Sequence, residues 1–594
     1  MLNRTTKLRW RRIFKRSQHS LENITLDLEK NTEKYFLARL PRLNNVKRFV
    51  VSWVMLMVLL GFGVILQIKA LSPYYLTLKP VSGGIYTEGI IGRYTSSNPI
   101  YASGSVDSSV SRLIFSSLLK YNSQNELVGD LAKEVKSDDR GIEYTVTLKD
   151  DLFWQDGVAL TADDVIFTYK TIQEPDAKSP LQNNWSGVKL EKIDDKTIKF
   201  TLPHALASFS QLLTNGIIPK HKLENIPVAQ LRTADFNTVK PVGSGPFKWD
   251  SIQISGQTPE TREEQIGLSA NKHYYGGEPN LDKFIIKAIH NKDRLIEQFE
   301  KQEIDAMVGL DSRPTEIGQE STIKEYSITL NAQVMVFFKT NQEILKEKPV
   351  RQALTKATNL VEIQTSLGYP VVISNSLLLK SDLGYSKDVV QAKYDLVEAN
   401  NILDKEGWVK GADGIREKAG VKLQFGLTSQ NNSEYDNISK LLQKQWKAVG
   451  VDLKVNLEDD TALQSTLALH NYDSLLYGIT VGDDPDVYAY WHSSQADVRS
   501  SSRLNFSELK SPAVDSALEA GRTRVDPNLR ITKYKPLLIA WSDEAPAIAL
   551  YQPRFLYITR GNIYGLNTKS MNTTTDRFSN VQNWRIKTEH TIIR

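Results

Sequence analysis

Side chains that could do acid–base or metal chemistry are present, but their spacing in the sequence does not indicate a catalytic or metal site. The eight histidines are scattered, and no two stand at the i,i+4 spacing with which a helix face binds a metal ion. The 69 Asp and Glu residues are too many for spacing to select an acid–base pair. One compact acidic stretch, Asp483–Asp486 (DDPD), has the composition of a solvated turn. The residue types therefore nominate no catalytic residue and no metal site.

Motifs of nucleotide-dependent and nucleophilic enzymes are missing from the sequence as well. There is no phosphate-binding P-loop, so any ATP hydrolysis would belong to a separate partner. There is no Gly-x-Ser-x-Gly nucleophile elbow, and Gly243-Ser-Gly245 lacks the further glycine of a dinucleotide-binding loop. The chain has no cysteine, which excludes disulfides, thiol catalysis, cysteine–zinc and iron–sulfur sites, and a lipid-modified cysteine anchor. We expect neither an enzyme nor a cofactor.

The net charge of +5 is unevenly distributed along the 594 residues. Residues 1–48 hold 13 Lys and Arg against 4 Asp and Glu, a balance of +9. The rest of the chain holds 61 basic and 65 acidic residues, a balance of −4. A basic tail is thus joined to a mildly acidic body, and the high overall pI is no evidence for nucleic-acid binding.

An uncharged segment of twenty residues, Phe49–Ile68 (FVVSWVMLMVLLGFGVILQI), follows the basic tail. As a helix it would span roughly 30 Å, the thickness of a bilayer's hydrocarbon core, which predicts a transmembrane anchor over 49–69. The heavier positive flank is N-terminal, so we expect a single-pass protein of the cell membrane with residues 1–48 in the cytoplasm and the body outside. A cleaved signal peptide, whose apolar region usually has about 7–15 residues, is the alternative.

The basic tail has two interpretations that the sequence leaves open. Seven Lys and Arg residues between Arg4 and Arg16 stand beside Trp10, Ile13 and Phe14. Such a segment could lie on an anionic inner leaflet, where each basic residue adds about 1 kcal/mol. Alternatively, its charges serve only to fix the topology of the membrane segment.

From residue 80 onward the sequence alternates strand-like and helix-like segments, as is typical of an α/β fold. Period-two alternation predicts strands at Tyr144–Lys149, Thr197–Leu202 and Val451–Val455. Capping patterns predict helices that begin at Thr161 and Asp395, and helix ends at Gly407 and Gly450.

An ordered series of motifs identifies the family that the body resembles. The first group lies within residues 127–169: Leu131-Ala132, Asp138-Asp139, Gly141, Tyr144, Leu148, Phe153-Trp154, Asp156-Gly157 and Leu160–Val165. The others are Gly83-Gly84, Asn98-Pro99, Pro241–Phe247, Asn271–Lys283, Val350–Leu354, Tyr394–Trp408, Asp483–Asp486, Pro512–Asp515, Asp526-Pro527 and Ala545–Tyr551. Together they resemble the extracellular solute-binding proteins of the peptide/nickel class (family 5), over roughly residues 80–560.

The resemblance implies an α/β fold in the form of a two-lobed periplasmic-binding-protein clamshell. The clamshell would be of type II with an extra subdomain in its first lobe, preceded by one N-terminal transmembrane helix. Lobe I would comprise residues 80–107, 241–330 and 540–594, the extra subdomain 108–240, and lobe II 331–539. The ligand would lie between the lobes, and their closure would bury it.

The resemblance also nominates ligand-binding residues. In peptide-binding relatives an acidic residue at this place in the second lobe pairs with the free α-amino group of the ligand, which makes Asp483 the first candidate and Asp484 the second. A carboxylate that loses water in a closed cleft needs a cation, and a peptide N-terminus supplies one. Tyr488 and Trp491 could line a side-chain pocket. The solvated turn remains the alternative for this stretch.

The implied function is an extracytoplasmic substrate-binding receptor of an ABC importer. Its partners would be a peptide or other small solute, the permease and ATPase subunits, and the membrane through the N-terminal helix, with no nucleic acid. The alternative is a membrane-anchored sensory or adhesion ectodomain on the same fold. Because a tail of 48 residues is too short for a catalytic output domain, transport is favoured.

Overall fold

The computed structural model describes residues 47–258, 261–318, 321–500, 503–566 and 569–592. The chain divides into two units, one made of Met1–Lys79 with Thr588–Arg594 and the other of Pro80–Lys587. Except for Lys47 and Arg48, the predicted basic tail lies outside the described residues.

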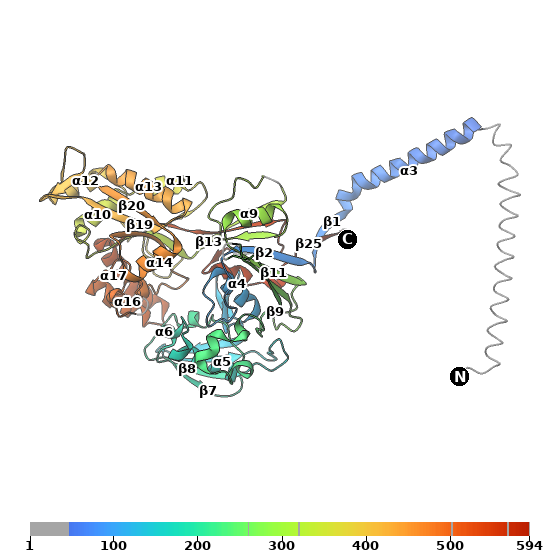
Figure 1. Cartoon of the computed structure of the whole chain (residues 1–594), viewed down its shortest axis with the longest axis horizontal. Coiled ribbons are helices and arrows are strands. Elements are labelled where there is room, and N and C mark those ends of the chain that lie inside the picture. The colour runs from blue at the N-terminus through green and yellow to red at the C-terminus, as the bar shows by residue number, and fades with distance from the viewer. Residues whose placement is uncertain (1–46, 259–260, 319–320, 501–502, 567–568, 593–594) are drawn as a thin grey trace. The chain divides into compact units, whose positions relative to one another are not determined.

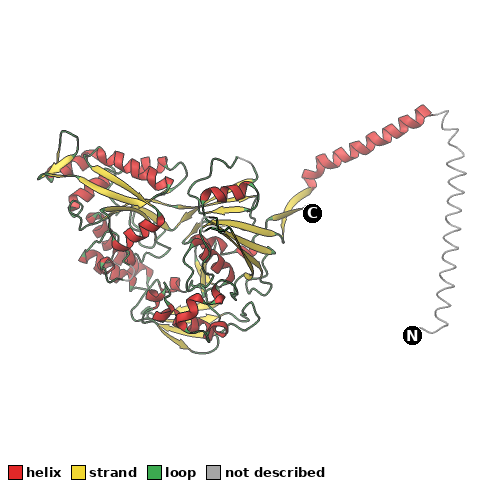
Figure 2. Ribbon diagram, viewed as in Figure 1, coloured by secondary structure: helices red, strands yellow, loops and turns green. Residues whose placement is uncertain are grey.

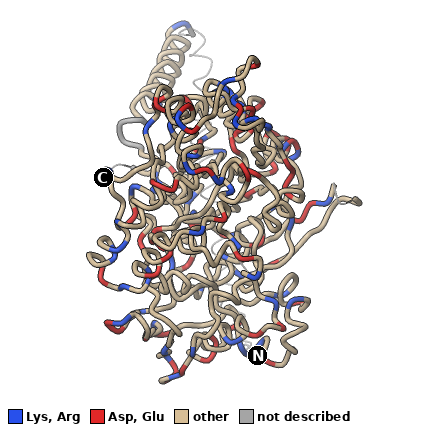
Figure 3. Tube along the Cα trace, turned by 90° about the vertical axis from the view of Figure 1, so that its left-hand side faces the viewer, with Lys and Arg blue, Asp and Glu red and all other residues tan. Residues whose placement is uncertain are grey.

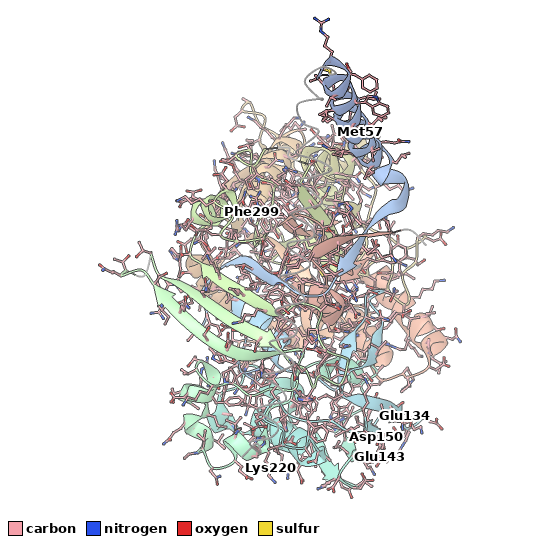
Figure 4. All side chains as sticks on the ribbon, turned by 90° about the vertical axis from the view of Figure 1, so that its right-hand side faces the viewer. Met57, Glu134, Glu143, Asp150, Lys220 and Phe299 are labelled. Carbon is pink, nitrogen blue, oxygen red and sulfur yellow. The ribbon has the colours of Figure 1, made fainter. Side chains whose placement is uncertain are left out.

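The smaller unit contains the helix α3 (Lys47–Tyr75), which covers the predicted membrane segment. Its part Arg48–Leu71 is long and apolar enough to cross a membrane, and none of it is buried within the structure. Met57, for example, projects from the helix and is 60% exposed (Figure 4). The strand β1 (Leu76–Val81) follows α3 directly and pairs with β25 (Lys587–Ile592). A signal sequence near the N-terminus can satisfy the same criterion of length and composition, so these features identify a candidate span.

An eight-stranded sheet forms lobe I of the larger unit, with the strand order β24-β13-β23-β12-β2-β11-β10-β9. In chain order its strands are β2 (Ile85–Ile91), β9 (Phe247–Ser255), β10 (Glu263–Ala270), β11 (Lys283–Ile289), β12 (Ala306–Val308), β13 (Ile323–Leu330), β23 (Arg554–Arg560) and β24 (Ser570–Met571). The central strand β2 runs parallel to both its neighbours, β11 and β12. The helices α4 (Ser105–Ile114) and α9 (Lys292–Glu300) pack on this sheet.

A six-stranded sheet forms lobe II, with the strand order β15-β22-β14-β21-β19-β20. Its strands are β14 (Ala332–Phe338), β15 (Val372–Ile373), β19 (Gln424–Gln430), β20 (Asp452–Glu458), β21 (Ser474–Thr480) and β22 (Ala547–Gln552). All seven residues of β14 are buried, as expected of a strand that is covered on both faces. Val334 and Val336 pack in one core and Met335 and Phe337 in another, because successive side chains point to opposite faces.

Helices account for the burial of both faces of this sheet (Figure 2). The core that contains Val334 also takes in α10 (Lys348–Lys356), α12 (Leu396–Lys405) and α13 (Ser433–Lys447). The core that contains Met335 takes in α14 (Asp460–Leu469), α15 (Tyr488–Trp491), α16 (Pro512–Arg522) and α17 (Pro527–Glu544). The smaller elements of lobe II are α11 (Leu360–Ser366), β16 (Val409–Lys410), β17 (Arg416–Lys418) and β18 (Val421–Lys422).

The extra subdomain is built on a separate four-stranded sheet, β5-β6-β8-β7, which Figure 1 shows grouped with α5 and α6. Its elements are β3 (Leu119–Tyr121), β4 (Leu127–Gly129), β5 (Ala132–Ser137), β6 (Glu143–Leu148), α5 (Ala162–Gln173), α6 (Gln182–Trp185), β7 (Lys189–Lys192), β8 (Thr197–Thr201), α7 (Phe209–Leu212) and α8 (Lys220–Leu223). The ion pairs Lys136–Glu134 and Lys199–Glu143 lie on its strands, and Figure 4 labels the two glutamates. Such solvent-accessible pairs contribute little stability.

The chain passes between the two lobes at two adjacent points. It enters lobe II between β13 and β14 and returns to lobe I between β22 and β23. The two connections are joined by hydrogen bonds, since the backbone N–H of Leu330 donates to the carbonyl of Pro553 (2.9 Å) and the Gln552 side chain donates to the carbonyl of Leu330 (3.3 Å). Paired connections of this kind form a hinge about which the two lobes can turn.

Most of the local predictions are confirmed. Strands occupy the three predicted stretches, and the Thr161 capping box begins α5. Asp395 caps α12, and Gly450 follows α13 at a φ of +87° that an L side chain rarely adopts. One segment lies elsewhere than expected: β22 pairs with β14 in the lobe II sheet, although a boundary at residue 540 assigns it to lobe I. The chain leaves that sheet only after Gln552, because β22 follows α17 and pairs with β14 before the chain continues into β23 of lobe I.

Candidate functional site

Asp483 stands where lobe II meets the extra subdomain. It follows β21, and its Oδ1 accepts hydrogen bonds from the Tyr121 phenol (2.8 Å) and from Nε2 of Gln211 (2.8 Å). Tyr121 ends β3 and Gln211 lies in α7, both in the extra subdomain. One carboxylate oxygen of lobe II is therefore held by two neutral donors from across the boundary between the lobes.

The electrostatic setting of Asp483 is that of a carboxylate without a cation. Burial raises its pKa, although the hydrogen bond from Tyr121 acts in the opposite direction. Burial and the charge of Asp483 raise the pKa of the Tyr121 phenol, which keeps that hydroxyl a donor. Within the described part of the chain no Lys, Arg or His lies within ion-pair distance of Asp483. A partly buried carboxylate whose side-chain partners are neutral favours the arrival of a positive charge.

Asp484, the second candidate, already has a cation. Arg530 on α17 donates to both of its oxygens, at 2.6 and 2.7 Å, in a bidentate ion pair. Both side chains are largely buried, with 12% of Asp484 and 7% of Arg530 exposed. This pair ties the loop after β21 to lobe II itself, so the geometry favours Asp483 over Asp484 as the residue that receives a ligand.

A second contact between the extra subdomain and lobe II surrounds Asp486. The Ser208 hydroxyl donates to its Oδ2 at 3.0 Å, and Arg522 at the end of α16 forms an ion pair with the same oxygen at 3.2 Å. The backbone N–H of Ala207 donates to the carbonyl of Arg522 at 2.9 Å. The subdomain thus holds lobe II through Asp486 as well as through Asp483.

The two aromatic candidates occupy different environments. Tyr488 is partly exposed, and its ring packs against His492 (4.1 Å between ring centroids) and under the Arg522 guanidinium (4.0 Å). Trp491 is fully buried, and its ring contacts those of Phe337 and Trp541 in the lobe II core. The position of Trp491 in the core therefore gives no support to its predicted role in a pocket. The sequence pattern alone does not distinguish a core tryptophan from one that lines a pocket.

A cavity of about 220 Å³ lies on the lobe I side of Tyr121. Polar side chains contribute much of its wall, including Arg112 of α4, Lys120 of β3 and Asp576. Lys120 forms an ion pair at 3.0 Å with the buried Asp130, and despite the opposing effect of burial this cation helps to lower the pKa of Asp130 to about 2. Tyr121 therefore connects the Asp483 carboxylate to a polar cavity large enough for a small solute group.

The residues that face Asp483 were not predictable from the motifs. Tyr121 belongs to a three-residue strand and Gln211 to a single helical turn, and no spacing rule links either to a position more than 270 residues away. No group of three or more His, Asp and Glu side chains within the described ranges is arranged to hold a metal ion. Acidic and basic residues are interspersed along the chain trace in Figure 3.

Comparison with known proteins gives one family. The model for bacterial extracellular solute-binding proteins, family 5, matches residues 126–500, more than half of the chain. The oligopeptide-binding protein AppA of Bacillus subtilis (strain 168) is 29% identical over 490 residues, which are 80% of this chain and 87% of that protein. Its structure in complex with a nonapeptide is similar with a TM-score of 0.70 and 27% identity, and the match covers 86% of this chain and 100% of that one.

A second solved structure extends the range of ligands among the similar proteins. NikZ from Campylobacter jejuni, in complex with Ni(L-His), is similar with a TM-score of 0.72 and 26% identity, and the match covers 84% of this chain and 99% of that chain. Similarity of this extent agrees with the two-lobed fold expected from the sequence.

The contact at Asp486 predicts that Ser208→Ala loosens the closed lobes. A hydrogen bond to a charged group contributes about 1.5 kcal/mol or more, so we expect the ratio of open to closed molecules without ligand to rise roughly tenfold. Because the chain has no cysteine, dyes on Lys189→Cys and Lys387→Cys would report the distance between the lobes by energy transfer in the full chain. Ser186→Ala, at an exposed position of the same subdomain, is the matched control. Identical transfer distributions for the two alanine variants would contradict this role of Ser208.

Proposed function

The chain belongs to the bacterial extracellular solute-binding proteins of family 5, and we propose that it captures peptides between its lobes and delivers them to an ABC permease. Family membership gives the receptor class, and the hinge formed by the two paired connections gives the closing motion. A receptor of this kind binds its solute without converting it, and the ATPase that drives import is a separate subunit.

The observation that carries the peptide assignment is the position of Asp483. Its carboxylate is partly buried, and the side chains that donate to it, those of Tyr121 and Gln211, are neutral groups of the opposite side. Tyr121 and Gln211 both donate to Oδ1, so neither of them occupies Oδ2. The ammonium at the N-terminus of a peptide supplies the missing charge and three N–H donors, and charge-assisted hydrogen bonds of this type are the strong ones.

The relatives support the same ligand class. The similar proteins include an oligopeptide-binding protein and its complex with a nonapeptide. In the present chain, Tyr121 joins the Asp483 carboxylate to a polar cavity with Arg112 and Lys120 in its wall. A peptide backbone, which carries a donor and an acceptor at each residue, matches such a wall better than an apolar solute does.

We further propose that α3 is retained as a single transmembrane anchor with the body outside the cell. Its apolar stretch exceeds the h-region of a signal peptide, and Lys47 and Arg48 stand on the N-terminal side, which the positive-inside rule assigns to the cytoplasm. An anchored receptor is held at a high effective concentration near a permease in the same membrane.

Substitution of Asp483 tests the peptide assignment. Asp483→Asn keeps an oxygen that can accept from Tyr121 and Gln211 but removes the charge, so we expect a short peptide with a free amino group to lose about 2–5 kcal/mol of binding free energy. Calorimetric titration of the full chain in detergent would measure this loss. Acidification should weaken binding to the wild type as Asp483 is protonated, at a higher pH than for an ordinary carboxyl, because its pKa is raised.

The titration needs two controls, a second variant and a second peptide. Asp388→Asn, an exposed aspartate of the same lobe, should bind as the wild type does. An N-acetylated peptide should not distinguish Asp483→Asn from the wild type, since it has no ammonium to lose. Equal affinity of Asp483→Asn and wild type for the free-amine peptide would exclude the amine clamp.

The anchor is tested by membrane extraction. We expect the full chain to stay in the membrane fraction after an alkaline carbonate wash, and a Val58→Arg, Leu60→Arg variant to be released, because each Arg at the centre of a span costs about 2.5–3.5 kcal/mol. A wild-type chain recovered in soluble form without α3 would show that the segment is a cleaved signal.

A further inference from the structure

Arg112, in the last turn of α4, has a guanidinium group whose hydrogen-bonding capacity the protein uses only in small part. Its side chain is 17% exposed, and its Nη1 donates to the Ser117 hydroxyl at 3.1 Å. The same nitrogen lies 3.9 Å from Oδ2 of Asp130, which is beyond hydrogen-bond distance. Nε and Nη2 donate no hydrogen bond to the described residues. Because a guanidinium offers five donors, most of those of Arg112 have no acceptor in the described part of the chain.

Other arginines that are more deeply buried use their donors within the fold. Arg530 donates three hydrogen bonds, two of them to one carboxylate. Arg577 donates four, and Arg351 donates to four backbone carbonyl groups. A cation that is removed from water without acceptors is costly, so the folds around these three residues supply the acceptors. Arg112 lacks such a set, which points to a role beyond the stability of the fold.

Two carboxylates near Arg112 are already engaged by other groups. Asp130 is buried and forms an ion pair with Lys120 at 3.0 Å. Asp576, in the segment after β24, accepts the backbone N–H of Thr573 at 2.9 Å and thereby completes a capping box. Neither carboxylate makes a hydrogen bond with Arg112. The free donors of Arg112 can therefore pair with a further carboxylate.

The cavity of about 220 Å³ connects Arg112 to the Asp483 site. Arg112 and Tyr121 both line it, and the Tyr121 phenol donates to Oδ1 of Asp483 at 2.8 Å. Thr214 lines it as well, and its hydroxyl donates at 2.7 Å to the carbonyl of Gln211. The Gln211 side chain is the second donor to Asp483. Both donors to Asp483 are thus part of the cavity wall or bonded to it.

Two serine hydroxyls add donors to the wall beside Arg112. Ser108 and Ser111 line the cavity and lie on α4 together with Arg112. Ser108 stands four residues before Arg112, which places the two on one face of the helix. Neither hydroxyl makes a hydrogen bond to the described residues. A cation flanked by hydroxyl donors suits an anion, and the anion that peptides carry is the carboxylate.

We propose that Arg112 binds a carboxylate of the ligand through paired hydrogen bonds, so that the receptor favours short peptides whose carboxylate lies close to the free amino group. The inference rests on the proposed function of Asp483 as the amine acceptor. Tyr121 reaches from the cavity to Asp483, so the two sites are about one side chain apart. Two or three residues at roughly 3.5 Å each cover that span. The carboxylate is either the C-terminus of such a peptide or an acidic side chain near its N-terminus.

A purely structural role of Arg112 makes a different prediction. A cation in the last turn of a helix interacts favourably with the helix dipole, and lysine fills that role as well as arginine does. Such a role would leave the ligand preference of the receptor unchanged when Arg112 is replaced. A residue that binds a carboxylate through a fixed fork of donors is not equivalent to lysine.

The test uses two pairs of peptides, each differing in one carboxylate. The first pair is Ala-Ala and its C-terminal amide, and the second is Ala-Glu-Ala-amide and Ala-Gln-Ala-amide. In calorimetric titrations of the full chain in detergent at pH 7, we expect the wild type to bind the carboxylate member of at least one pair at least tenfold more tightly. A preference in the first pair identifies the C-terminus as the bound group, and a preference in the second identifies the side chain.

Three variants assign the preference to Arg112. Arg112→Gln should reduce it to within twofold and change the affinity for the uncharged member of the pair by less than twofold. Arg112→Lys keeps the charge at the end of α4 and should lose at least threefold of the preference, so it carries the test if Arg112→Gln does not fold. Arg140→Gln, which removes a 71% exposed arginine of the extra subdomain, is the matched control and should keep the full preference.

Four results would overturn the inference, and they separate it from the proposed function. A wild type that binds all four peptides without preference would refute the role of Arg112 and leave the peptide receptor intact. A full preference in Arg112→Gln or Arg112→Lys would show that the carboxylate is bound elsewhere. Equal losses for both members of a pair in these variants would make Arg112 a structural residue. A wild type that binds none of the peptides would refute both the inference and the proposed function.

Discussion

A carboxylate that is withdrawn from water must find donors or a cation, and this constraint organises the two lobes. In lobe I, Glu88 and Arg577 are both fully buried and pair with each other, which joins β2 to the C-terminal segment. In lobe II, Arg530 neutralises Asp484. Asp483 differs from Asp484, because its side-chain donors are neutral and belong to the opposite side of the boundary. The contact that brings the lobes together is therefore also the place where a cation is missing.

The fold places the Asp483 carboxylate, which has no cationic partner among the described residues, at the boundary between two lobes that can turn relative to each other. The two hinge connections, one at Leu330 and one at Pro553, are hydrogen-bonded to each other. The two lobes can therefore turn about the hinge while these two connections stay paired. The β14 strand is buried on both faces, and each lobe can therefore move as a packed unit. Closure then depends on a few polar contacts near Asp483 and Asp486, whose strength sets how much of the protein is closed before a ligand arrives.

The sequence predicted those features that are local. Capping boxes, period-two strands and helix-ending glycines follow from the conformations of neighbouring residues, and the Thr161, Asp395 and Gly450 predictions correspond to observed helix ends. The resemblance to the family supplied the two lobes and pointed to Asp483. The boundary at residue 540 was placed too early, because the sequence does not state which sheet β22 joins.

The sequence did not reveal which residues of the extra subdomain contact the acidic stretch of lobe II. Tyr121, Gln211 and Ser208 reach lobe II only because two separately folded parts meet, and their positions depend on the relative placement of the sheets. Trp491 illustrates the converse error, since an aromatic residue beside a candidate site can belong to the core.

The most direct test of the account is thermal unfolding of the full chain with short peptides, their N-acetylated forms, sugars and divalent cations. A ligand that binds only the folded state stabilises it by about 2.7 kcal/mol at a hundredfold excess over Kd. The account predicts a rise in Tm with free-amine peptides, a much smaller rise with the acetylated forms, and none with sugars or metal ions. Equal stabilisation by acetylated and free peptides would contradict the role of Asp483, and stabilisation by a sugar or a metal ion alone would contradict the peptide assignment.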